Sequence, residues 1–286
     1  MPSFGDFEIF WRSGQLVLSG QSPYHEGAFF YPYPTALWFA LWALIPLAVS
    51  KWLWFSLSLV AIVFVGRRRA LAIAAFPPVL ASLWLGQLDC LLLGLLGLVK
   101  EDKWAGWAVA LLTLKPQIVV LLLPWLIWHW WRENKRALRD FGIASLVIWG
   151  GSFALAPNWF SEWRSHTRPI IQSMEASPSL WGLTHYAMIF VPVVALISLV
   201  LLFYSMRQKS FDVANCLSFL INPAIITYDL TLLAVSWKRW WFVPLLIGWL
   251  AVFLSNSPLL QHGLPYSLVT LATLILILNT PGQVRL

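Results

Sequence analysis

Long apolar runs separated by short polar connectors fill almost the whole chain after residue 34. Runs of this kind, with basic clusters between them, are typical of helices that cross a membrane several times. The predicted spans lie at roughly 51–66, 70–84, 88–99, 104–115, 117–131, 137–156, 183–205, 211–222, 224–237, 240–255 and 265–279. The pattern therefore predicts an all-α, polytopic integral membrane helical bundle of about eleven spans.

The first 50 residues have a different pattern. Residues 6–19 place their apolar side chains on one side of a helix, which favours a helix lying at the membrane surface. The apolar segment 35–45 is about 18 Å long as a helix, too short for a hydrocarbon core of about 30 Å. We therefore divide the chain into an external first-loop segment with juxtamembrane helices, residues 1–50, and a single transmembrane bundle, residues 51–286.

Composition and charge agree with a membrane protein. Hydrophobic residues make up 59% and charged residues 11% of the chain, whereas soluble domains carry roughly 25% charged residues. If Arg67–Arg69 face the cytoplasm, fourteen of the nineteen Lys and Arg residues fall on the inner side. This follows the positive-inside rule and explains the basic pI without nucleic acid. We expect membrane lipids, and no nucleic acid, as partners. We also expect the chain to be a multi-pass protein of the cell membrane.

The same layout places the polar turns on the extracytoplasmic side, and two residues there are candidates for chemistry. Asp6 either caps the first helix, as Asp commonly does, or supplies a catalytic carboxylate. Lys115 interrupts an apolar run directly before Pro116, where a cation is costly and therefore indicates function. It either binds a phosphate or extends its ammonium to the outer interface.

Three further groups are polar but less specific. Gln87 and Asp89 follow Gly86 at a turn, where Asp89 caps a helix or faces a ligand. Asp229 follows Tyr228 and leaves the same two possibilities. Arg164, His166 and Arg168 form a basic cluster that meets either a phosphate or lipid headgroups.

Motifs for other kinds of enzyme are missing from the sequence. It contains no phosphate-binding glycine loop, no serine-histidine-aspartate pattern and no dinucleotide fingerprint. The histidines lack metal-ligand spacing, so we expect no metal and no cofactor. Any reaction would therefore use a substrate delivered in the membrane.

Several motifs in order resemble glycosyltransferase family 87, which belongs to the GT-C superfamily of integral membrane glycosyltransferases. The resemblance covers most of the chain. It rests on Asp6 with the helix after it, Ser19-Gly20-Gln21-Ser22-Pro23-Tyr24, Tyr31-Pro32-Tyr33-Pro34, Leu85-Gly86-Gln87-Leu88-Asp89, Leu114-Lys115-Pro116-Gln117, Asn222-Pro223 and Tyr228-Asp229. The family normally has a membrane span before the acid, whereas only five residues precede Asp6 here. We therefore expect this chain to lack that first span.

The resemblance implies an inverting transfer of a hexose, with mannose the first expectation, from a polyprenyl-phosphate sugar to a glycolipid or glycan acceptor. Asp6 would be the general base on the extracytoplasmic face. Lys115, Arg164 and Arg168 would bind the donor phosphate. The expected substrate-binding residues are Gln87, Asp89, Gln117, Tyr31, Tyr33 and Asp229.

Two other functions remain open at this point. A transporter or flippase of lipid-linked glycans shares broken helices and an intramembrane lysine, but more often shows an internal repeat, which we do not find. An inactive truncated homologue would fit a missing first span. Asp6 separates these alternatives from the enzyme, because only the enzyme needs its carboxylate for a proton transfer.

Overall fold

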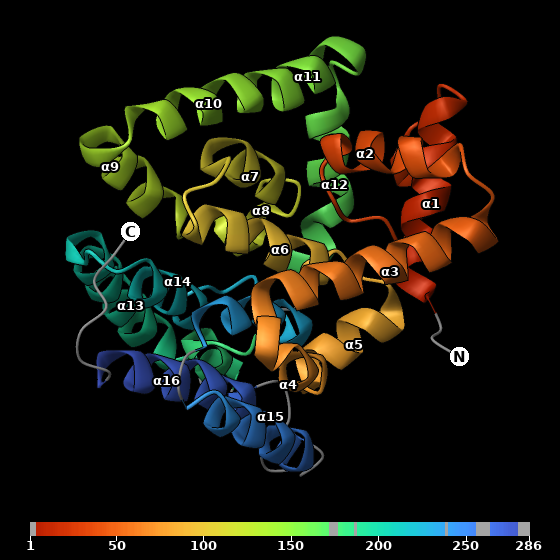
Figure 1. The fold of residues 1–286 in the computed structure, drawn as a ribbon. Coiled ribbons are helices and arrows are strands. Elements are labelled where there is room, and N and C mark those ends of the chain that lie inside the picture. The colour runs from red at the N-terminus through yellow and green to blue at the C-terminus, as the bar shows by residue number, and fades with distance from the viewer. Residues whose placement is uncertain (1–3, 172–176, 186–187, 238–239, 256–263, 280–286) are drawn as a thin grey trace.

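The computed structural model describes residues 4–171, 177–185, 188–237, 240–255 and 264–279. Within these ranges the chain forms helices joined by short turns and contains no strand (Figure 1). The prediction of an all-α fold is therefore confirmed.

The first half of the chain forms mostly short helices, many of them broken by proline or glycine. Their bounds are α1 (Gly5–Leu18), η1 (Pro23–Glu26), α2 (Tyr33–Ala43), α3 (Leu47–Gly66), η2 (Arg67–Arg69), α4 (Ala70–Ala74), α5 (Pro77–Leu85), α6 (Asp89–Lys100), α7 (Ala105–Leu112), α8 (Pro116–Val119) and α9 (Leu123–Glu133).

The second half includes a π-helical turn, η3, and a long 3₁₀ run, η6. The bounds are α10 (Lys135–Ser145), η3 (Leu146–Gly150), α11 (Gly151–Leu155), α12 (Trp159–Ile171), η5 (Leu180–His185), α13 (Phe190–Arg207), α14 (Phe211–Leu220), η6 (Thr227–Ser236), α15 (Phe242–Ser255) and α16 (Leu264–Leu278).

Aromatic side chains attach the N-terminal helices to the bundle. Phe10 of α1 stacks on Phe39 of α2 with ring centroids 4.7 Å apart, and Phe7 lies 5.2 Å from Trp54 of α3. All four side chains are buried. Aromatic pairs at these distances add attraction beyond the apolar area that they bury. Helix α1 is therefore held at one end of the bundle, beside α2 and α3 (Figure 1).

Three helical stretches in the described chain are long and apolar enough to cross a membrane. They are Leu47–Ala74, which bends at Arg67 (φ 48°), Lys135–Leu155 and Phe190–Arg207. Helix α2 has eleven residues, about 16 Å, in keeping with a segment that does not cross. Membrane helices are thus supported. The predicted count of about eleven spans is not confirmed, because most of the other helices are short.

The structure differs most from the predicted spans at 224–237. Here the chain forms η6, and every residue of it from Asp229 to Ser236 is buried. The segment packs against α5, α6 and α14. The apolar segment that we predicted as a membrane span is therefore a 3₁₀ run in the interior of the protein. The predicted division of the chain at residue 50 stays a prediction.

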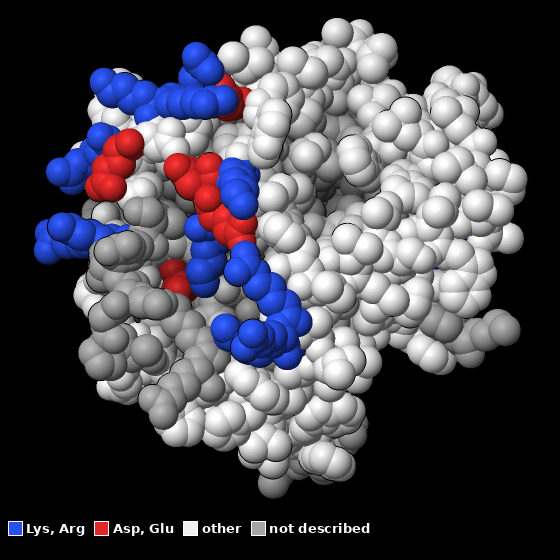
Figure 2. Space-filling view, in the orientation of Figure 1, with Lys and Arg blue, Asp and Glu red and all other residues white. Residues whose placement is uncertain are grey.

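Charged side chains gather on one flank of the molecule. In Figure 2 the Lys and Arg side chains lie over α9, α10, the end of α6 and the turn η2 after α3, whereas the visible surface over α2 shows none. The exposed ion pair between Arg67 and Glu101 (2.7 Å) belongs to this set, as does the pair of Lys103 with Glu101 (3.1 Å). The predicted cytoplasmic connectors would place their basic residues together on one side in this way.

Candidate functional site

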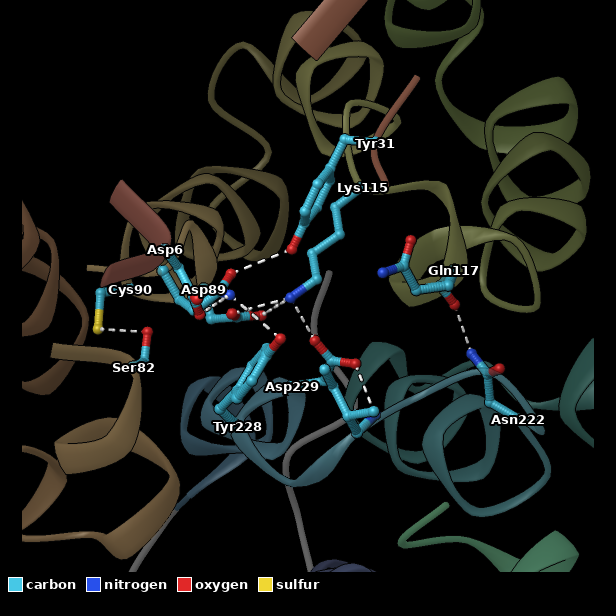
Figure 3. A network of polar contacts seen from close by, with 12 residues as sticks. Asp6, Tyr31, Ser82, Asp89, Cys90, Lys115, Gln117, Asn222, Tyr228 and Asp229 are labelled. Carbon is cyan, nitrogen blue, oxygen red and sulfur yellow. Dashed lines mark hydrogen bonds and ion pairs between the residues drawn. The ribbon is translucent and has the colours of Figure 1, made fainter. Parts of the chain in front are cut away.

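Lys115 forms a buried ion cluster with two aspartates from distant parts of the chain. Its Nζ lies 2.9 Å from both carboxylate oxygens of Asp89 and 2.5 Å from Oδ1 of Asp229. All three side chains are fully buried. Figure 3 shows the ammonium between the two carboxylates. We call these three residues the ion cluster.

Local sequence explains why Lys115 sits in the interior. Proline at position 116 has no backbone N–H and starts the short helix α8, so α7 ends before it and Lys115 lies in the break. The Thr35 hydroxyl donates to the backbone oxygen of Leu114 at 2.6 Å, and the Asn222 amide donates to the backbone oxygen of Gln117. The freed carbonyls of the broken helix are thereby satisfied by other segments.

Asp229 has two partners at once. Its Oδ2 accepts from the backbone N–H of Ile226 at 2.8 Å, and its Oδ1 faces Lys115. The first contact closes the start of η6, and the second ties that start to the α7–α8 break. Of the two possibilities that the sequence left open, the cap is therefore present, and the other carboxylate oxygen pairs with Lys115.

Asp6 is placed by contacts between α1 and the α5–α6 turn. The Phe4 N–H donates to the backbone oxygen of Trp84 at 3.0 Å. Gly86 ends α5 at φ 75°, and a Cβ there would lie only 2.7 Å from Cβ of Phe7. Glycine thus provides both the left-handed turn and the close approach of α1. Asp6, in the first turn of α1, comes within hydrogen-bonding distance of Gln87.

Gln87 joins Asp6 to two tyrosines. Its Nε2 donates to Oδ2 of Asp6 and to the Tyr228 hydroxyl, the latter at 3.1 Å, while its Oε1 accepts from the Tyr31 hydroxyl at 3.1 Å. Lys115 lies 4.7 Å from the centre of the Tyr228 ring, a cation–π contact. We call Asp6, Gln87, Tyr31 and Tyr228 the polar network, and it adjoins the ion cluster (Figure 3).

Burial raises the pKa of Tyr31 well above its usual value, although nearby Lys115 opposes the shift. The Tyr31 hydroxyl therefore stays protonated at ordinary pH and donates to Oε1 of Gln87. The Nε2 end of the Gln87 amide faces Asp6, because the carboxylate oxygen there accepts a hydrogen bond.

The arrangement can now be compared with known proteins. A family model, glycosyltransferase family 87, matches residues 29–257, about four fifths of the chain. The chain belongs to glycosyltransferase family 87. Neither the search of curated proteins nor that of solved structures finds a match.

This family 87 glycosyltransferase carries its ion cluster, Gln87 and both network tyrosines inside the matched range, and Asp6 lies before it. A glycosyltransferase needs a sugar donor and an acceptor, so membership of the family establishes both as substrates.

The geometry decides several alternatives that the sequence left open. Asp6 is not a helix cap, because Phe4 holds the N-cap position without a side-chain bond and the Asp6 carboxylate faces Gln87 instead. Lys115 does not reach an outer interface, because its side chain is completely buried. Asp89 has no capping hydrogen bond, and both of its oxygens face Lys115.

Of the other expected site residues, Tyr33 and Arg164 have no contact with the ion cluster in the described structure, whereas Gln117 lies closer to it. Tyr33 begins α2, where burial and the neighbouring Glu162 carboxylate raise its pKa. Arg164 is exposed on α12, and no contact joins it to the ion cluster in the described structure. The side chain of Arg168 lies outside the described residues. Gln117 is half-buried, and its side chain points toward Lys115 in Figure 3.

Tyr228 belongs to the site, although the sequence did not single it out. This tyrosine contacts both Gln87 and Lys115 and so links the polar network to the ion cluster. The available signal was its position directly before Asp229 in a segment that we already expected at the site. Within the described ranges, no group of three His, Cys, Asp or Glu side chains is arranged to hold a metal.

The site thus combines a half-buried carboxylate with a buried, acid-rich centre. Asp6 offers a proton acceptor that is held by one amide. Lys115 offers the ion cluster's positive charge, shared between two carboxylates. General-base catalysis with an anionic leaving group uses a proton acceptor and a cation, and the site holds one of each, with the cation paired to two carboxylates.

Proposed function

We propose that this protein is an inverting, GT-C-type hexosyltransferase. It moves a sugar, mannose in the first instance, from a polyprenyl-phosphate donor to a glycolipid or glycan acceptor on the extracytoplasmic side of the cell membrane. The observation that carries the proposal is the convergence of four distant segments on Asp6 and Lys115 through Gln87 and Tyr228.

Asp6 is the general base in this proposal. An acceptor hydroxyl oxygen attacks the anomeric carbon while its proton passes to the Asp6 carboxylate. The bond from that carbon to the phosphate oxygen breaks on the opposite face, and polyprenyl phosphate leaves with the electron pair. The anomeric configuration inverts, and a positioned base of this kind contributes about 10²- to 10⁴-fold in rate.

The donor phosphate needs a cation, and Lys115 is the cation of the ion cluster. Three carboxylate oxygens already surround its ammonium, which has three N–H donors. We therefore propose that a phosphate oxygen replaces one carboxylate oxygen when donor binds. Arg164 and Arg168 of α12 are the other proposed phosphate contacts, for a phosphate that enters from the α12 side.

The remaining substrate contacts and the architecture belong to the same proposal. Gln117 and Tyr33 contact the sugar or the acceptor, and Asp89 and Asp229 keep Lys115 in place between turnovers. The shorter apolar helices complete a GT-C-like bundle of about eleven spans. Among these helices are Phe211–Leu220, Phe242–Leu254 and Pro265–Leu278.

The test is sugar transfer in membranes that contain the protein, with labelled polyprenyl-phosphate mannose and mixed glycolipid acceptors. Asp6→Asn keeps the shape of the side chain and removes the base, so we expect transfer to fall at least about 100-fold. Glu8→Gln is the matched control, because Glu8 lies on the same helix and pairs with Lys51 instead. We expect Glu8→Gln to retain most of the activity.

Undiminished transfer by Asp6→Asn at equal expression would contradict the role of Asp6. A labelled donor that crosses the membrane without any transfer would favour the flippase. Absence of both activities, with the other hexoses also tried as donors, would favour an inactive homologue.

A further inference from the structure

Helix α9 lines an apolar groove of about 540 Å³ with one of its faces. Leu123, Ile127 and Trp131 line it at intervals of four residues, which places them on one side of the helix. Met206, near the end of α13, also lines the groove, which therefore lies where α9 and α13 meet. From Leu123 to Trp131 the helix rises about 12 Å, close to the half of a hydrocarbon core of about 30 Å that one leaflet supplies.

The groove is open toward the surroundings of the protein. Trp128 and Trp131 line it, and they are 50% and 64% exposed. The other face of α9 packs into the core through Trp125 and Leu126, which are both buried. In a membrane protein an uncovered apolar groove of this kind meets lipid, so the hydrocarbon chain of a lipid is its natural occupant.

Two arginines without an acid partner lie at one end of the groove. Arg132 directly follows Trp131, and its guanidinium lies 5.7 Å from the centre of the Trp128 ring. Arg207 directly follows Met206. Both arginines are exposed, and within the described residues neither forms an ion pair. The cation–π contact thus holds an uncompensated positive charge over the wall of the groove.

Nearby acids do not neutralise this end of the groove. Glu133 follows Arg132, but its carboxylate lies 3.8 Å from Nε2 of His129, which lines a separate pocket. Arg139 of α10, by contrast, pairs with Asp140 at 3.0 Å. The charge at the end of the groove is therefore available to an anion, and the N–H groups of arginine suit a phosphate.

We propose that the groove binds an anionic phospholipid, with one acyl chain along α9 and the headgroup phosphate at Arg132 and Arg207. A lipid with a net negative headgroup satisfies both the apolar wall and the arginines, whereas the ammonium of a zwitterionic lipid would offset the attraction. The predicted layout places both arginines on the cytoplasmic side, where anionic lipids attract basic residues. The site shares no residue with the ion cluster or the polar network, so it does not depend on the proposed sugar transfer.

Two arginines of the charged flank provide a matched test. The probe is phosphatidylglycerol with a photoreactive diazirine on one acyl chain, diluted in phosphatidylcholine nanodiscs that contain the protein. It should label peptides from α9 and α13. We expect Arg132→Gln to reduce this labelling about fivefold, the usual effect of one basic residue at an anionic membrane surface. Arg139→Gln removes the same charge from α10 and should change the labelling less than about twofold.

The headgroup and the acyl chain are tested separately. Phosphatidylcholine with the same diazirine should label α9 severalfold less than phosphatidylglycerol does. Ile127→Trp fills the groove and should reduce the phosphatidylglycerol labelling severalfold. Ile143→Trp adds the same side chain at an exposed position of α10 outside the groove and should not. Soluble glycerol phosphate, which has no acyl chain, should not compete with the labelled lipid.

Several outcomes would overturn the proposal. Equal losses in Arg132→Gln and Arg139→Gln would mean that the lipid follows the overall charge of the flank. Equal labelling by the two lipids, or labelling that Ile127→Trp leaves unchanged, would remove the headgroup or the groove from the site. Competition by glycerol phosphate would show a phosphate site without a lipid chain. The four substituted side chains are exposed, so each variant should keep the unfolding midpoint of the unaltered protein.

Discussion

Helix α6 carries an ion pair at each end, and the two ends differ in burial. At its N-terminus Asp89 contacts Lys115, and neither side chain is exposed. At its C-terminus Lys100 contacts Asp212 at 2.6 Å and the backbone oxygen of Val235 at 2.7 Å, with 30% of the Lys100 side chain exposed. The C-terminal end also lies beside the charged flank of the molecule (Figure 2).

The difference shows at which end of α6 the burial of charged groups costs more free energy. At the C-terminal end Asp212 is buried, but the partly exposed Lys100 ammonium keeps part of its hydration, so this pair costs less to form than the fully buried one. At the N-terminal end the desolvation of three charged groups must be offset by their mutual contacts, the Ile226 N–H and the Tyr228 ring, without exposure to water. Acids also outnumber the cation there. Charges buried at this cost in a membrane protein indicate function, so the comparison favours the N-terminal end of α6 as the working site.

The largest predicted difference between the two ends of α6 is the loss of stability when the lysine at each end is replaced. Lys115→Met leaves Asp89 and Asp229 buried without their cation, so we expect a loss of about 3–5 kcal/mol in the free energy of unfolding. Lys100→Met should cost less, about 1–3 kcal/mol, because the Lys100 side chain is partly exposed and water can take the place of its ammonium beside Asp212. The measurement is the thermal unfolding midpoint of each variant in lipid nanodiscs.

The control for this prediction removes the stranded charges as well. Lys115→Met combined with Asp89→Asn and Asp229→Asn should recover part of the lost stability, since no unpaired charge then remains buried. Equal destabilisation by Lys115→Met and Lys100→Met would show that burial does not separate the two ends of α6.

A smaller effect is expected from Tyr31, which lies just before α2. Tyr31→Phe removes the hydroxyl that orients Gln87. We expect Tyr31→Phe to lower kcat for sugar transfer about 5- to 10-fold, in line with the loss of one hydrogen bond of about 1 kcal/mol. Tyr204→Phe is the matched control, because Tyr204 is exposed on α13 and has no place in the proposed site, and it should stay within about twofold.

The pH dependence of the effect of Tyr31→Phe tests whether the Tyr31 hydroxyl acts as a hydrogen-bond donor. Burial raises the pKa of Tyr31 well above its usual value of about 10, so its hydroxyl donates at every pH from about 6 to 9. The ratio of unaltered to Tyr31→Phe rates should therefore be constant over this range. In an Asp6→Asn background the same substitution should cause little further loss, because the side chains act as one network. A full additional loss there would place Tyr31 in another role.

Features set by neighbouring residues could be predicted from the sequence. The apolar periodicity after Asp6 predicts a surface helix over 6–19, and the structure has α1 at Gly5–Leu18. Pro116 predicts a broken helix at Lys115, and the break is present. The two prolines that bound the segment 35–45 predict a short helix, which the structure places at Tyr33–Ala43. In each case the deciding interaction lies within a few residues along the chain.

Features that depend on distant pairing could not be predicted. Nothing in the run around Lys115 says that two carboxylates take up its donors, so a free phosphate-binding cation was the natural expectation. Likewise, the apolar residues of η6 suit a lipid-facing helix and an interior 3₁₀ segment equally well. Only the contacts of η6 with α6 and α14 select the second.

The smallest predicted effect belongs to the charged flank. Arg67 contacts Glu101 at 2.7 Å, but 74% of its side chain is exposed. We expect Arg67→Ala to change the free energy of unfolding by less than about 1 kcal/mol and to leave sugar transfer unchanged, because solvent screens such pairs. A double-mutant cycle with Glu101→Ala measures the pair directly. A coupling energy close to that between Lys115 and Asp89 would mean that pairing, and not burial, sets the value of an ion pair in this fold, and the contrast between the two ends of α6 would lose its basis.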